Sequence, residues 1–118
     1  MSLDGRHARF LVLASLEARA ATHRHQMGAV IVKSGRVMGK GCSKTGQYHH
    51  AEVKALAKNW RSEFEGATAY VVRLRRNQPF GMARPCRGCW QALVDAGVKT
   101  VVYSTNDAAY PYRMEVVI

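Results

Sequence analysis

Apolar residues near the start of the chain recur at intervals of three and four positions. Between Leu3 and Ala21 this pattern includes Phe10, Ala14 and Ala18. A helix gathers residues at that spacing on one side, where they can pack against a core. We therefore predict an amphipathic first helix within residues 3–21.

The next apolar runs have the character of strands. Residues 27–33 are rich in β-branched side chains, Ser34-Gly35 follows as a turn, and residues 36–42 resume an extended pattern. Two such runs joined by a two-residue turn predict a β-hairpin. The glycines of the second run, at 39 and 41, favour a softened or bulged strand.

A helical pattern returns at His50, because Val53, Leu56 and Trp60 again repeat at three and four positions. This predicts a helix that begins near the histidine. The remaining predicted elements are a strand over 68–74, a loop over 81–85, a helix from Cys86 capped near Gly97, a strand over 98–103 and a last strand over 114–118.

This order of elements predicts an α/β fold in which helices pack on one mixed sheet of about five strands. Only residues 104–113 separate the last two strands, which favours an antiparallel return over a crossover helix. The chain has 118 residues, 47% of them hydrophobic, and shows no linker or repeat. We therefore expect one domain over residues 1–118, able to bury a core.

The charge is strongly positive. Eighteen lysines and arginines against eight aspartates and glutamates give a formal net charge of +10. Solubility, an anionic substrate and a polynucleotide would each account for such an excess. Several arginines cluster in sequence near the start of the helix predicted from Cys86. Contact with a phosphate group is one hypothesis for them: Arg73, Arg75, Arg76, Arg84 and Arg87.

The three cysteines are too few for a secreted disulfide framework and favour a reducing compartment, so we expect a cytoplasmic protein. The Arg-rich segment 2–26 is interpreted as the first helix of the domain and not as a transit peptide, because Asp4 and Glu17 interrupt it. No stretch approaches the length of a membrane span.

Two short motifs carry the chemistry. Cys86 and Cys89 are three positions apart at a helix start, so both thiolates can reach one metal ion. Upstream, His50-Ala51-Glu52 supplies a third ligand, His50, and an acid. Three protein ligands leave zinc one open position for water, which is typical of a catalytic site. Glu52 would then move protons as general acid and base. Together, HxE and PCxxC form the signature of zinc deaminases.

Other interpretations of these residues remain open at this stage. A CxxC pair also serves thiol redox exchange, and a non-catalytic zinc-stabilised binding module would need the same thiolates. Cys42 as a fourth ligand would close the zinc site, although a thiol packed at a strand end is the favoured interpretation. Trp60 and Trp90 are expected in the core, whereas Tyr48 is better placed to flank a base.

With these motifs, the chain resembles the cytidine and deoxycytidylate deaminase superfamily, especially its short single-domain bacterial or phage members. The segments 27–32 and 96–103 are similar to the family's first and fourth strands. The resemblance implies a three-layer α/β/α fold, zinc, and a homodimer or homotetramer. It also implies that the Ala51 amide holds the base carbonyl. This chain has Ser43 where the family often has a sugar-binding Asn, and Arg84 where it often has Ser or Thr.

The sequence thus predicts hydrolytic deamination of a cytosine nucleoside or nucleotide, namely cytidine, deoxycytidine or dCMP. The backbone carbonyl of Arg84 is expected to accept from the amino group, and Ser43 and Tyr48 are expected near the substrate. Deamination of a base in tRNA or single-stranded DNA is the alternative, less favoured because no separate basic tail or aromatic platform is evident.

Overall fold

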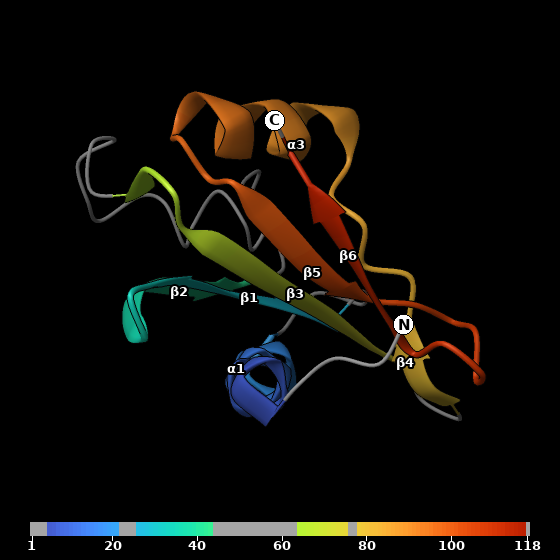
Figure 1. The fold of residues 1–118 in the computed structure, drawn as a ribbon. Coiled ribbons are helices and arrows are strands. Elements are labelled where there is room, and N and C mark those ends of the chain that lie inside the picture. Colours follow the sequence, from blue (N-terminus) through green and yellow to red (C-terminus); the bar gives the residue numbers. More distant parts are fainter. Residues whose placement is uncertain (1–4, 22–25, 44–63, 76–77, 118) are drawn as a thin grey trace.

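The computed structural model of the chain describes residues 5–21, 26–43, 64–75 and 78–117 (Figure 1). Within these ranges it contains two helices and six strands. In chain order they are α1 (Gly5–Arg19), β1 (Gln26–Lys33), β2 (Arg36–Cys42), β3 (Thr68–Arg75), β4 (Gln78–Gly81), α3 (Arg87–Asp95), β5 (Thr100–Ser104) and β6 (Tyr112–Val116).

The strands form one mixed sheet in the order β2-β1-β3-β5-β6, with the short β4 paired to β3 off this path. β3 and β5 are parallel, whereas the other pairs are antiparallel. Helix α1 lies on one side of the sheet and α3 on the other (Figure 1). This arrangement confirms the three-layer α/β/α fold, and the antiparallel pairing of β5 with β6 confirms the predicted return.

On the α1 side, helix and sheet approach closely because small residues line the contact. Ala14 and Ala18 are fully buried. A Cβ added at Gly28 of β1 would overlap the Ala14 carbonyl oxygen and the Ala18 nitrogen. Phe10 and Leu11 complete the apolar cluster on this side against residues of β1, β3 and β5. Glycine at 28 is therefore a requirement of the backbone-to-backbone contact.

On the α3 side, Leu93 and Ala96 pack on alternate residues of β1, β3 and β5. Helix α3 ends where Gly97 adopts a φ of 89°, a conformation that glycine allows. The Gly97 carbonyl then accepts a hydrogen bond of 2.8 Å from the Gly66 amide, and the Leu93 carbonyl accepts one of 3.0 Å from the Val98 amide. The first of these bonds places the end of the helix beside the residues that precede β3.

The hairpin is confirmed, with Ser34 and Gly35 at φ values of 53° and 76°. Its register shifts between Ile31 and Val32, opposite the glycine-containing part of β2, as the bulge hypothesis expects. The prediction missed β4 and assigned Gly81 to a loop. β4 has only four residues and pairs with β3 through a register shift, so it has little periodicity of its own.

The helix predicted from His50 lies outside the described residues. None of the described helices is long and apolar enough to cross a bilayer. The last strand covers Tyr112–Val116, two residues earlier than the sequence pattern suggested.

Candidate active site

The segment that leads into α3 is tied to the sheet at its first residues. The Ala83 amide donates to the Ser104 carbonyl at the end of β5, over 2.9 Å. The fully buried Ser104 hydroxyl donates to the Gly81 carbonyl at 2.8 Å and accepts from the Arg73 amide at 3.0 Å. Ser104 therefore joins the ends of β3, β4 and β5 just before the chain turns toward α3.

Cys86 and Cys89 lie at the start of α3, as the spacing predicted. Cys86 is the N-cap residue, with extended backbone angles, and its carbonyl accepts a 2.8 Å hydrogen bond from the Trp90 amide. Cys89 is buried at 4% exposure, whereas Cys86 is exposed. Both cysteines therefore lie within the first turn of α3.

The Arg84 side chain connects this segment to the edge strand and to α3. Its Nε donates to a Glu115 carboxylate oxygen at 2.7 Å, and its guanidinium lies 4.4 Å from the centre of the Trp90 ring. The Tyr103 hydroxyl donates to the same Glu115 oxygen at 2.8 Å. One carboxylate on β6 thus accepts from the segment before Cys86 and from β5.

The pKa values of this group follow from these contacts. The hydrogen bond from Arg84 lowers the pKa of Glu115, against an opposing contribution from burial, and Tyr103 and Arg113 lower it further. Burial raises the pKa of Tyr103, and its hydrogen bond to Glu115 adds to the effect. The carboxylate is therefore ionised and the phenol protonated at neutral pH, the state in which both hydrogen bonds form.

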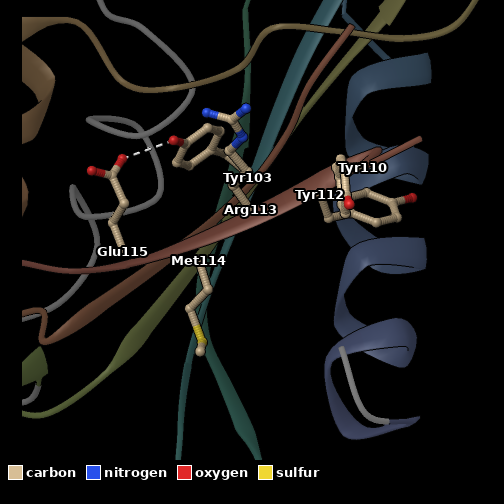
Figure 2. A pocket seen from close by; sticks show the side chains of 6 residues that line it. All are labelled: Tyr103, Tyr110, Tyr112, Arg113, Met114 and Glu115. Atoms are coloured by element: carbon tan, nitrogen blue, oxygen red, sulfur yellow. Dashed lines mark hydrogen bonds between the residues drawn. The ribbon is translucent and has the colours of Figure 1, made fainter. Parts of the chain in front are cut away.

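A hollow of about 310 Å³ lies beside this group, along β6. Figure 2 shows Tyr103, Arg113 and Glu115 on one side of the strand, with Tyr110 and Tyr112 apart from them near the start of β6. The lining residues are Tyr103, Tyr110, Tyr112, Arg113, Met114 and Glu115. The hollow is thus lined by aromatic rings together with one basic and one acidic side chain.

Ser43 lies directly after β2, where its hydroxyl oxygen accepts a 3.1 Å hydrogen bond from the Met27 amide. The Ser43 amide in turn donates to the Met27 carbonyl at 3.0 Å. This reciprocal pair closes the open end of the hairpin. Contact between Ser43 and a sugar stays a prediction.

Four of the predicted site residues lie outside the described part of the chain: Tyr48, His50, Ala51 and Glu52. Within the described residues, no group of three His, Cys, Asp or Glu side chains could hold a metal ion. Cys42, the buried last residue of β2, therefore does not join Cys86 and Cys89 in such a group. Two thiols at one helix start fit two positions of a zinc site, and the third ligand stays the predicted His50.

Sequence reasoning missed Ser104, Tyr103 and Glu115. Glu115 alternates with apolar residues in the last strand, which indicates a second polar face, but nothing local names Arg84 as its partner. Ser104 follows an apolar run, and its complete burial is set by the strands around it.

Comparison with known proteins places these features in a family. Residues 1–105 match the model of the cytidine and deoxycytidylate deaminase zinc-binding region. The chain is 42% identical to the riboflavin biosynthesis protein RibD of Escherichia coli over 101 residues, covering 85% of this chain and 26% of that protein. It is 33% identical to a diaminohydroxyphosphoribosylamino-pyrimidine deaminase of Buchnera aphidicola over 100 residues, or 84% of this chain and 64% of that one.

The solved cytidine deaminase of Burkholderia pseudomallei superposes with a TM-score of 0.69 over 94% of this chain and 92% of that one. At 23% identity, this likeness shows the fold alone. The chain spans 20–28% of the length of the RibD proteins it matches. On the strength of the family match, this chain belongs to the cytidine and deoxycytidylate deaminase zinc-binding family.

Proposed function

We propose that this chain is a zinc-dependent hydrolytic deaminase that acts on an amino-bearing pyrimidine of a small nucleotide-like substrate. The observation that carries the proposal is the position of Cys86 and Cys89 at the start of α3, in a chain of the deaminase family. A redox pair or a structural zinc module would use the same thiols but would have no need of the HxE motif.

In this proposal His50, Cys86 and Cys89 hold the zinc, with Glu52 beside it. Zinc at a site with an open position makes hydroxide available near neutral pH and polarises bound groups. Glu52 takes a proton from the attacking water and passes it to the ring nitrogen next to the amino-bearing carbon. Glu52 would then take the proton of the hydroxyl group added to that carbon and deliver it to the amino group, which leaves as ammonia while the carbonyl forms.

The neighbouring residues would orient the base. The Ala51 amide is proposed to donate to the base carbonyl, and the Arg84 carbonyl to accept from the amino group. Tyr48 would flank the ring, and Ser43 is the candidate contact to the sugar. These assignments follow the family resemblance. The hydrogen bonds of the Ala83 amide and the Cys86 carbonyl support the one at Arg84, because they fix the backbone on both sides of that carbonyl.

Two pyrimidine substrates are the candidates. A cytosine nucleoside or nucleotide is the substrate expected from the motifs. The pyrimidine named for the Buchnera deaminase is favoured by sequence identity, since several RibD proteins are 32–42% identical to this chain. Both carry an exocyclic amine beside a ring nitrogen, so the same proton transfers serve either one.

Charge supports an anionic form of the substrate. The side chains of Arg73 and Arg75 both lie against Gly81. Arg113 pairs with Tyr103 across β5 and β6, and Tyr103 packs in the core cluster under α3. Because cross-strand partners share a face, Arg113 lies on the α3 side as well. Arginines on the side of the sheet that carries the thiols favour a phosphate group over a neutral nucleoside.

We further propose that residues 1–118 form one deaminase domain and that it assembles as a homodimer or homotetramer, as the resemblance implies. The match over residues 1–105 supports the extent of the domain. Light scattering of the purified chain measures the assembly.

The test is ammonia release from a panel: cytosine, cytidine, deoxycytidine, dCMP, the diaminohydroxyphosphoribosylamino-pyrimidine, guanine, adenosine and short oligonucleotides. We expect turnover of a phosphorylated pyrimidine with about one zinc bound per chain. Glu52→Gln, which is nearly isosteric but cannot shuttle protons, should keep the zinc and lose about 100- to 10,000-fold in turnover. Absence of zinc, or an oligonucleotide deaminated faster than every monomer, would contradict the proposal.

A further inference from the structure

The chain segment that leads to the proposed zinc ligand Cys86 is anchored by a side chain outside the PCxxC motif. Arg84 stands two residues before Cys86 and contacts Glu115 of β6 and Trp90 of α3. Residues 83 and 86 are held through their backbones, by Ser104 and Trp90 respectively. The side-chain contacts of Arg84 anchor the segment at a third point, between residues 83 and 86.

These contacts join three parts of the chain: the segment before α3, strand β5 and strand β6. Arg84 and Glu115 are 31 residues apart, and Tyr103 is 12 residues from Glu115. A carboxylate that accepts from both a guanidinium and a phenol loses freedom to rotate, so it stays where Arg84 can reach it. The Trp90 indole ring adds a cation–π contact to the Arg84 guanidinium.

We propose that Glu115 and Tyr103 are positioning residues that act through Arg84 to hold the segment before α3 in the geometry in which Cys86 binds zinc. The inference rests on the proposed zinc site. Neither residue touches the metal or the substrate in this account. Their effect is to reduce the conformational freedom that Cys86, an exposed helix-cap residue, would lose on binding.

The effect should be local. The side chains of Arg84 and Glu115 are 48% and 37% exposed, so water screens the pair and it adds little to the stability of the whole domain. Groups that orient metal ligands nevertheless change metal affinity by about 10- to 100-fold. Because Glu115 acts one step further from the ligand, we expect an effect of about 5-fold, below the lower end of that range.

The decisive measurement is zinc affinity, by competition with a chromophoric chelator, in the purified chain and in Glu115→Gln. Glu17→Gln is the matched control, because it makes the same change on α1, on the opposite side of the sheet. We expect zinc affinity about 5-fold weaker in Glu115→Gln and unchanged in Glu17→Gln. Tyr103→Phe, which removes only a hydroxyl, should weaken it less and serves if Glu115→Gln does not fold.

A double-variant cycle shows whether the route is through Arg84. If it is, Glu115→Gln added to Arg84→Met should weaken zinc binding no further than Arg84→Met alone. Replacing zinc with Co²⁺ gives a second readout, because the thiolate absorption bands report the coordination geometry. We expect these bands to shift or broaden in Glu115→Gln and to match the parent chain in Glu17→Gln.

The outcomes separate this inference from the function on which it rests. If the parent chain binds zinc and deaminates, and Glu115→Gln and Tyr103→Phe both keep its zinc affinity within a factor of two, the positioning role is wrong and the function stands. Additive effects of Arg84→Met and Glu115→Gln would equally overturn it. A parent chain that binds no zinc would overturn both.

Discussion

The two sides of the sheet are built differently. On the α1 side, Phe10, Leu11 and Ala14 pack on apolar residues of the strands, and Gly28 lets the helix backbone lie directly on β1. On the α3 side, an apolar core is bordered by the hydrogen-bonded group of Arg84, Tyr103 and Glu115 and by the thiols at the helix start.

The difference indicates that the two sides contribute differently to stability and to chemistry. Close apolar packing stabilises the fold but offers no group that could bind a metal or move a proton. Charged and hydrogen-bonded side chains add less to stability but hold chemical groups at defined positions. Substitutions in the packing on the α1 side should therefore change stability alone, whereas those at the thiols and in the group of Arg84, Tyr103 and Glu115 should change metal binding and activity.

The largest effect is expected at the thiols. Cys89→Ser removes one of the proposed zinc ligands, so we expect loss of the metal and of nearly all deamination. Cys42→Ser is the matched control, since this buried cysteine lies at the end of β2 and is not expected to bind the metal. Zinc analysis and ammonia release check both. Equal zinc loss in the two variants would break the distinction between Cys42 and the site.

On the opposite side, Gly28→Ala places a methyl group against the α1 backbone. Backbone cannot move aside as a side chain can, so we expect the free energy of unfolding to fall by about 3 kcal/mol. The zinc content of the folded fraction should stay unchanged. Urea unfolding measures the loss, with Gly5→Ala as a control at a site where an added Cβ meets nothing within 4 Å. A stable Gly28→Ala with altered zinc binding would reverse the expected division.

Ser104 connects strands β3, β4 and β5 to the segment that precedes α3. Ser104→Ala removes the hydrogen bonds to the Gly81 carbonyl and from the Arg73 amide in a fully buried setting. We expect unfolding to become easier by about 2 kcal/mol. Ser15→Ala, which removes a hydroxyl bound to a helix carbonyl on α1, should cost less. Similar thermal shifts for the two serines would show that the junction is not special.

The smallest effect is the pH dependence of the Glu115 pair. Arg84 lowers the folded-state pKa of Glu115 below its ordinary value of 4.5. The pair therefore stabilises the fold fully above the unfolded pKa, and this contribution is lost as pH falls through the folded pKa. With both side chains more than a third exposed, it should amount to less than about 1 kcal/mol.

Thermal melts of the parent chain and Glu115→Gln, with a chelator present, measure this contribution. The difference between them should shrink as pH falls from 7 to below 4.5. Arg113 and Tyr103 also face Glu115 and would shift the midpoint but not the direction of the change. A difference that grows toward acid pH would show that the carboxylate is not stabilised in the fold.

Much of the architecture could be predicted because its signals are local. The repeat around Phe10 and Ala14 predicted α1, the Ser34-Gly35 turn predicted the hairpin, and the Cys86–Cys89 spacing predicted thiols at a helix start. Each depends on residues within one or two turns of chain, where backbone geometry relates spacing to position directly. The HxE and PCxxC motifs likewise identified the family, which the match over residues 1–105 confirms.

Other features depended on contacts between distant segments. β4 exists because β3 offers it an edge, and the buried position of Ser104 depends on three strand ends meeting there. Arg84, predicted as a substrate contact in a basic cluster, also has its side chain held by Glu115, 31 residues away. Sequence alone predicted which residues would bind zinc and move protons. Tertiary structure decided which carboxylate anchors the segment before Cys86, because only the pairing of β6 with β5 brings Glu115 to Arg84.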